Sequence, residues 1–285
     1  MKTFLKVWLS ISLIAIGFGI GLLILAAASG ASFKDVPTFS LNESYQDVKR
    51  LDVEVNYGNV EIVRGNEFSI FAENLVDEGM ESYVTEGTWV IKEYNREMIN
   101  FFGIKVPVWD VVHIDGWGDD FDPKIIITVP EDFVAENVSF KIAAGSAKIE
   151  EINALTGDFK VETGELKIEE LTISNKSSYS IGAGNMILKN MTAKDITVDC
   201  GLGNVEISGS ISGDSDISCG VGRVDVNLNG DDDDYTYDVS SGLGNVVIDG
   251  DKYNSISNKI IKNESTENKI TLDCGVGNIR VEFMN

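Results

Sequence analysis

The stretch ITVDCGLGNVEISGSISGDSDI, residues 196–217, decides the fold of this chain. Apolar and polar residues alternate from Ile196 to Cys200, and they alternate again from Val205 to Ile207. Strict alternation over about five residues is typical of a strand that buries one face. The phrase between the two runs, Gly-Leu-Gly-Asn, consists mainly of residues that tolerate left-handed turns. We therefore predict two short strands joined at this phrase.

The same phrase recurs along the chain. Clear copies are IGAGNMIL (181–188), CGVGRVDV (219–226), SGLGNVVI (241–248) and CGVGNIRV (274–281), and weaker ones are NYGNVEI (56–62), AAGSAKI (143–149) and ETGELKI (162–168). From Gly145 onward, the second glycines are separated by steps of 19, 20, 19, 19, 22 and 33 residues. A near-constant step indicates one structural unit stacked on itself.

Two architectures use a period of this length. One is an antiparallel meander, and the other is a solenoid in which equivalent strands stack in parallel about 4.8 Å apart. Recurrence of one residue type at each position favours the solenoid, so we predict an all-β, β-solenoid or β-helix-like stack of about 19–20-residue coils. The residue between the glycines forms an apolar column that we expect in the core: Ala183, Leu202, Val221, Leu243 and Val276. The following asparagines, interrupted by Arg223, are expected to form a hydrogen-bonded ladder.

The three cysteines share one position of the repeat. Cys200, Cys219 and Cys274 each stand directly before the first glycine of a phrase, at a position that alternates inward. We interpret them as small buried apolar residues, because stacked coils would hold the thiols in a row with no histidine nearby. Sequence order places only Cys200 and Cys219 on neighbouring coils. A disulfide between these two stays open, although the odd count argues against a disulfide framework.

Composition and charge exclude some function classes. The chain has 285 residues, of which 43% are hydrophobic, enough for one sizeable domain and an anchor. Its formal net charge of −23 argues against nucleic-acid binding, which uses basic surfaces, and disfavours adhesion to anionic lipid. Such acidity suits cations or basic partners, and a solvated surface explains it equally well.

Residues 7–28 form an uncharged apolar run. As a helix it would be about 33 Å long, enough to cross a bilayer core. Lys2 and Lys6 before it orient the N-terminus toward the cytoplasm and the repeats outside. The alternative is a cleaved signal peptide, whose apolar region is usually only ~7–15 residues long. We expect a single-pass transmembrane helix, or an uncleaved signal, within residues 1–33, followed by a linker at 34–47 and an extracytoplasmic domain in the cell membrane.

An aromatic-rich β segment, residues 48–122, interrupts the regular pattern. We expect it to cap the open end of the repeat domain, residues 123–285, which would otherwise offer unpaired strand edges. Long irregular connections are often functional, so an alternative is a surface for a sugar, a peptide or a membrane. The candidate residues for that surface are Trp89, Phe101, Phe102, Trp109 and Trp117. The only histidine, His113, has no partner pattern and gives no catalytic signal.

A run of four aspartates lies where the period lengthens to 22 residues. The run is Asp231, Asp232, Asp233 and Asp234. Calcium needs several oxygen atoms that converge at about 2.3–2.6 Å, and the run matches no calcium-binding loop pattern. We interpret it as a solvated turn, and it is also the best cation candidate in the sequence. We predict no cofactor.

The stretch PKIIITVPEDFVAENVSFKIAAGSAKIEEINA, followed by LTGDFKVETGELKIEELT and the later GLGNVEI coils, resembles the DUF4097 family of bacterial β-strand-repeat proteins, a "putative adhesin" group. The resemblance covers residues 123–283, with a looser match at 48–75. It implies a β-solenoid-like fold, commonly behind a membrane anchor in Gram-positive bacteria, and some relatives look connected with envelope-stress systems. The family offers no established catalytic residues, so none are assigned. Residues 76–122 depart from the family core.

Three function hypotheses follow. The first is a non-enzymatic, membrane-anchored envelope protein with an adhesin-like, scaffolding or stress-sensing role, whose partners would be an envelope protein or a cell-wall polymer and not nucleic acid. The second is a polysaccharide-acting β-helix enzyme, which needs converging carboxylates; outward acidic residues such as Glu206, Asp225 and Glu282 occur on the coils. The third is an accessory subunit of a membrane signalling complex.

Overall fold

The computed structural model describes residues 38–76, 79–93, 98–101, 104–107, 123–253, 260–262 and 266–284. The chain divides into two units, Met1–Thr38 and Phe39–Asn285, and all strands belong to the second or begin at its border. Within the described residues, no helix has the length and apolar character needed to cross a membrane. The run predicted as an anchor lies outside the described residues.

The fold is all-β. Its strands are β1 (Thr38–Tyr45), β2 (Arg50–Gly65), β3 (Phe68–Val76), β4 (Met80–Thr85), β5 (Thr88–Glu93), β6 (Met98–Phe101), β7 (Ile104–Pro107), β8 (Lys124–Pro130), β9 (Ala135–Ile173), β10 (Ser177–Lys194), β11 (Ile196–Ser212), β12 (Asp214–Asn229), β13 (Tyr235–Ile248), β14 (Asp251–Tyr253), β15 (Ile260–Lys262) and β16 (Asn268–Met284). A 3-10 helix, η3 (Asp232–Asp234), precedes β13. Strands β6 and β7 form a separate hairpin.

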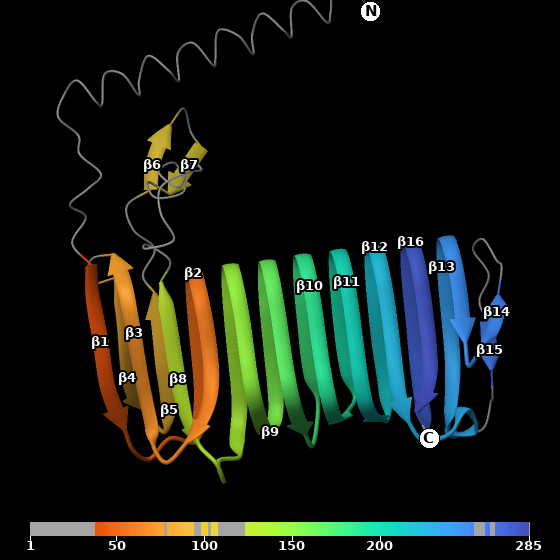
Figure 1. Cartoon of the computed structure of the whole chain (residues 1–285), viewed down its shortest axis with the longest axis horizontal. Helices are drawn as coiled ribbons and strands as arrows, with labels where there is room; N and C mark the ends of the chain where they lie inside the picture. The colour runs from red at the N-terminus through yellow and green to blue at the C-terminus, as the bar shows by residue number, and fades with distance from the viewer. Residues whose placement is uncertain are drawn as a thin grey trace, which may run out of the picture. The chain divides into compact units, whose positions relative to one another are not determined.

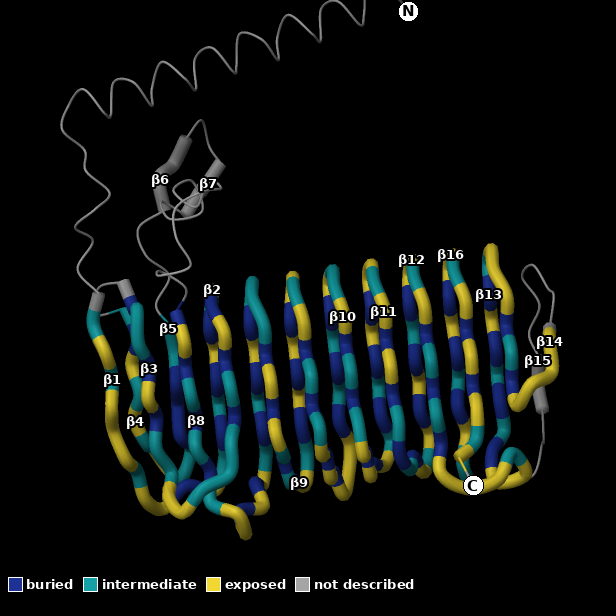
Figure 2. The backbone as a smooth tube through the Cα atoms, viewed as in Figure 1, coloured by how far each residue is buried: buried dark blue, intermediate teal, exposed yellow. Residues whose placement is uncertain are grey.

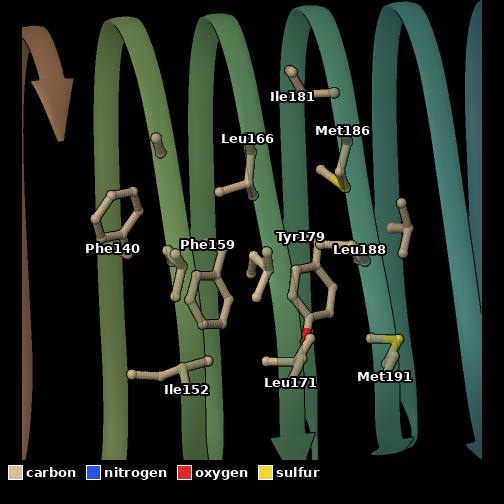
Figure 3. Packing of buried hydrophobic residues seen from close by; sticks show 14 of the residues in the cluster. Phe140, Ile152, Phe159, Leu166, Leu171, Tyr179, Ile181, Met186, Leu188 and Met191 are labelled. Carbon is tan, nitrogen blue, oxygen red and sulfur yellow. The ribbon is translucent and has the colours of Figure 1, made fainter. Parts of the chain in front are cut away.

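The long strands stack in parallel and in register, which confirms the parallel alternative over the meander for this part of the chain. Strand β10 pairs with β9 on one side and with β11 on the other, and their phrase glycines are direct partners. Each long strand bends back on itself, so that its two halves run along opposite sides of the core (Figure 1). In β10 the bend lies between Ile181 and Met186, on either side of the repeated phrase (Figure 3). The 39-residue β9 contains two phrases, at Gly145 and Gly164.

The last two repeats do not follow sequence order. Strand β16 pairs in parallel with β12 on one side and with β13 on the other, so the C-terminal strand lies between two strands that are consecutive in sequence (Figure 1). The 33-residue step between Gly244 and Gly277 is the connection that makes this insertion possible. Cys274 is therefore the direct register partner of Cys219, and the prediction that only Cys200 and Cys219 are neighbours is wrong.

The first repeat is completed by two separate strands. β5 pairs in parallel with the first half of β2, and β8 pairs in parallel with its second half. Between them, the backbone N–H of Asn56 donates to Glu93 Oε2 at 2.8 Å, and that of Asn59 donates to the Pro123 carbonyl at 2.9 Å. β5 thus ends, and β8 begins, beside the position where β2 has its bend. Strand β3 then pairs antiparallel with β8, β4 pairs antiparallel with β5, and β1 pairs with β3.

The core lies between the two halves of the bent strands. Buried positions alternate with less buried ones along every long strand (Figure 2), as the apolar alternation predicts. Aromatic rings from successive repeats stack inside (Figure 3): the centroids of Phe159 and Tyr179 lie 5.3 Å apart at an interplanar angle of 6°. Equivalent residues therefore pack on each other along the stack, and the core is continuous from one repeat to the next.

Candidate binding surface

The bends require glycine because the backbones of neighbouring repeats touch there. Gly203 has a φ of 144°, and a Cβ at this position would lie 1.7 Å from the carbonyl oxygen of Gly184. A Cβ on Gly222 would lie 1.6 Å from the carbonyl oxygen of Gly203. Real Cβ atoms do not approach a carbonyl so closely, and this φ is one that residues with side chains rarely adopt. The phrase is therefore fixed by backbone packing.

The residue between the two glycines points outward, which corrects the prediction that this column fills the core. Four such side chains stand on adjacent strands β11, β12, β16 and β13, and we call them the apolar ridge: Leu202, Val221, Val276 and Leu243. Their exposed fractions are 56%, 46%, 46% and 60%. The ridge is an unbroken row because each member is the register partner of the next.

A phase shift in the sequence explains the error. Buried residues occupy even numbers from Ile196 to Cys200 and odd numbers at Val205 and Ile207. The inward-facing positions therefore shift by one residue within the phrase. Because of this shift, Leu202 points outward although its number is even. This parity change is a signal that could have identified the ridge from sequence alone.

Some asparagines of the column beside the ridge are hydrogen-bonded to one another. Asn204 Nδ2 donates to Asn185 Oδ1 at 3.0 Å, as the ladder prediction requires. At the other end of the column, the backbone N–H of Asn245 donates to Asn278 Oδ1 at 3.4 Å. Arg223 interrupts the ladder, and its Nε lies 2.6 Å from Asp225 Oδ2. These side chains therefore serve the turn and its immediate neighbours.

A polar cleft of about 520 Å³ lies where β2, β3, β8 and β9 meet. Its charged lining consists of three lysines and three glutamates: Lys124, Lys148, Lys167, Glu61, Glu73 and Glu165. Lys148 is the register partner of Glu61, and Lys124 is that of Glu73. The opposite charges are thus interleaved, and the cleft has little net charge of its own. Sequence reasoning missed these lysines, although Lys148 and Lys167 recur at the 19-residue step.

The predicted aromatic surface is only partly described. Trp89, in β5, is fully buried, its Nε1 donates to Ser82 Oγ at 3.0 Å, and its ring packs 5.0 Å from that of Tyr45. It therefore belongs to the core under the N-terminal strands and is not available to a ligand. Phe101 lies in β6, and nothing is described of its side chain. Phe102, Trp109 and Trp117 lie outside the described residues, as does His113.

The aspartate run forms a local turn. Asp231 caps η3: its Oδ1 accepts from the backbone N–H of Asp233 at 3.2 Å, and its own N–H donates to Asp234 Oδ2 at 3.4 Å. These carboxylates are used by backbone groups of the same turn. In the part of the chain that the structure describes, no three His, Cys, Asp or Glu side chains are grouped so that they could hold a metal ion.

The outward carboxylates on the last repeats pair with arginines. Asp225 lies between Arg223 and Arg280, with its Oδ1 3.9 Å from Arg280 Nε. Glu282 Oε1 lies 3.3 Å from Arg280 Nη1. Glu206 and Asp225 are register partners on the solvent side of β11 and β12. The arrangement is a surface charge network on one face of the strands.

Comparisons with solved structures find proteins of low sequence identity to this chain. A putative adhesin from Bacteroides fragilis is 13% identical, with 87% of this chain and 98% of that chain covered and a TM-score of 0.46. A putative cell adhesion protein from Clostridium sporogenes is 13% identical, with 87% and 100% covered and a TM-score of 0.35. A putative lipid binding protein from Parabacteroides distasonis is 12% identical, with 85% and 96% covered and a TM-score of 0.31.

No curated protein matches the chain significantly. A protein-family model, by contrast, spans the whole array of bent strands, from the first residue of β1 to within three residues of the end of the chain. It matches residues 38–282, and the chain belongs to the Toastrack DUF4097 family.

Proposed function

We propose that the chain is a non-enzymatic binding protein of the bacterial cell envelope, anchored in the membrane by residues 7–28 and displaying its repeats outside the cell. Its role is adhesin-like, scaffolding or stress-sensing, and its partner is an envelope protein or a cell-wall polymer. The uncharged run of 22 residues behind Lys2 and Lys6 supports the anchor and its orientation.

The apolar ridge is the observation that carries the binding role. Single exposed apolar side chains are common on protein surfaces, whereas contiguous ones mark interaction sites. The ridge has four in a row, each about half exposed or more. The glycine pairs on either side hold the row in place, because the backbones of adjacent repeats are in contact there. A partner thus meets an apolar row on a preformed backbone, which lowers the ordering cost of binding.

The charge network counts against hydrolytic chemistry on these repeats. A glycosidase needs two carboxyl groups on either side of a substrate, one acting as an acid and one as a base or nucleophile. Asp225 and Glu282 are instead paired with Arg223 and Arg280 on a single outward face. The geometry of Asp225 and Glu282 therefore fits the non-enzymatic role better than the enzyme hypothesis.

Location is tested by cell fractionation and surface proteolysis. Expressed in a Gram-positive host, the full chain should sediment with membranes, and protease added to intact cells should digest residues 39–285. A variant that lacks residues 1–33 should leave the membrane fraction. Recovery of the intact protein in the cytoplasm would exclude the anchor and the outward orientation.

The ridge is tested by site-specific crosslinking. A photoreactive phenylalanine at Leu243 or Leu202 should crosslink one discrete envelope component in intact cells. The matched control is Leu155, which is 43% exposed and is not one of the residues between paired glycines. When the photoreactive residue is placed at Val276 instead, replacing both ridge leucines with asparagine should abolish the crosslink to that component. Equal crosslinking from Leu155 would show that the ridge is not the contact surface.

A further inference from the structure

Three thiols form one buried row across adjacent strands. Cys200 on β11 is the register partner of Cys219 on β12, and Cys219 is the register partner of Cys274 on β16. Their exposed fractions are 3%, 2% and 0%, and all three are free thiols in this structure. Ser241 continues the row on β13 and is equally buried.

The register limits which thiols can bond to each other. Directly paired residues on neighbouring parallel strands lie about 4.8 Å apart. This spacing is within the range of about 4.4–6.8 Å that Cα atoms span in a disulfide. Cys200 and Cys274 are two strands apart, about 9.6 Å by the same spacing, which is too far. Only two disulfides are therefore possible, both include Cys219, and each excludes the other.

We propose that this row is a disulfide site in which Cys219 is the obligatory partner, so that the oxidised chain carries one intramolecular disulfide and one remaining thiol. Either disulfide joins two interior strands of the stack. The Cys219–Cys274 bond would tie the inserted strand β16 to β12, and the Cys200–Cys219 bond would tie β12 to β11. The third thiol lies next to the bond and can exchange with it.

The oxidant is a small disulfide such as oxidised glutathione. The Cys219 thiolate attacks one sulfur of the oxidant and releases one thiol, and a neighbouring cysteine thiolate then attacks Cys219 Sγ and releases the second. Two protein thiols are oxidised, one small disulfide is reduced, and the two protons pass to the released thiols. Burial raises the pKa of the Cys219 thiol to about 12 and that of Cys274 to about 11. Thiolates are therefore scarce in the folded chain, so oxidation and exchange take place during refolding, and the redox buffer breaks any bond that the final register does not allow.

The test is refolding of the full-length chain, in detergent, in a glutathione redox buffer, followed by mass spectrometry after alkylation. The wild-type chain should lose about 2 Da and retain one alkylatable thiol once unfolded. Cys200→Ser and Cys274→Ser should each lose about 2 Da as well, whereas Cys219→Ser should keep two free thiols. Peptide mapping should find only bonds that include Cys219.

Serine is a suitable replacement, because Ser241 already occupies the same row. Circular dichroism must show a β spectrum for each variant, and a variant that fails this check is replaced by its alanine equivalent. Three free thiols in the refolded wild-type chain would overturn the proposal. A disulfide in Cys219→Ser, or a Cys200–Cys274 bond in any variant, would overturn it too.

Discussion

At the scale of single residues, the bend glycines carry the strictest constraint in the molecule. Gly203→Ala should lower the free energy of unfolding by about 3 kcal/mol or more, because its Cβ would meet the Gly184 carbonyl oxygen in a backbone conformation that is itself unfavourable. Gly250→Ala is the matched control. Gly250 has a φ of 79° but no atom within 4 Å of an added Cβ, so the loss should be only about 1–2 kcal/mol. Urea denaturation measures both, and similar losses would contradict the backbone-contact explanation.

Because the three thiols are buried, we predict that the folded state becomes less stable at alkaline pH. Burial raises the pKa of Cys219 to about 12 and that of Cys274 to about 11, while an exposed thiol titrates near about 8.5. The folded state thus favours the neutral thiols. Their contribution is complete below pH about 8.5 and declines as the pH rises toward the folded-state values.

Urea denaturation of the reduced chain from pH 7 to pH 10 measures this decline. Burial also raises the pKa of Tyr179, but its contribution declines only as the pH approaches about 10, where an exposed tyrosine titrates, so the thiols dominate most of this window. The free energy of unfolding should fall over the window, and it should fall less in Cys219→Ser. An identical slope in the variant would show that the thiols are not responsible.

At the scale of elements, the apolar alternation and the repeat period predict the strands and their parallel stacking, but they do not predict the strand order. Five phrases from Gly145 to Gly222, at steps of 19 or 20 residues, predict parallel equivalence, and β9, β10, β11 and β12 follow sequence order as expected. The step from Gly244 to Gly277 is only lengthened, and nothing local in it specifies that β16 enters between β12 and β13. That choice depends on long-range pairing, which a repeat sequence permits at several places because all repeats present similar edges.

The candidate surface, likewise, can be predicted in part from local sequence and depends in part on contacts between distant segments. The parity change around Leu202 predicts an outward ridge once the bend is recognised. By contrast, the cleft of Lys124, Lys148 and Glu73 joins segments that are far apart in sequence, so no local pattern could reveal it. Trp89 is a related case: its buried ring packs against Tyr45 from β1 and Phe68 from β3, and the local sequence around Trp89 does not show these contacts.

The inserted position of β16 predicts strong protection of its amides. Both edges of β16 are hydrogen-bonded to neighbouring strands over most of its length. Its amides should exchange as slowly as those of β11. Those of β14, a three-residue strand at the edge of β13, should exchange much faster. Hydrogen–deuterium exchange with mass spectrometry measures this, and rapid exchange throughout β16 would contradict the insertion.

At the scale of the whole molecule, the two ends of the stack would offer unpaired strand edges to which further strands could add. The described residues show antiparallel additions toward both limits of the array: β3, with β1 beyond it, and β4 on the N-terminal side, and β14 and β15 on the edge of β13. Antiparallel additions of this kind interrupt the parallel template on which another copy could stack. The net charge of −23 adds mutual repulsion between copies.

The same charge predicts how salt affects stability. The chain carries 46 acidic and 23 basic residues, so screening should relieve repulsion within the folded state, and the melting temperature should rise from low to physiological ionic strength. Sodium chloride and calcium chloride at equal ionic strength separate general screening from a bound cation. Because the carboxylates of Asp231 and Asp234 bond to backbone groups of their own turn, we expect the two salts to raise the melting temperature equally. Asp232→Asn with Asp233→Asn is the matched variant. An additional increase with calcium that this variant abolishes would show that the aspartate run binds the ion, with the turn rearranging around it.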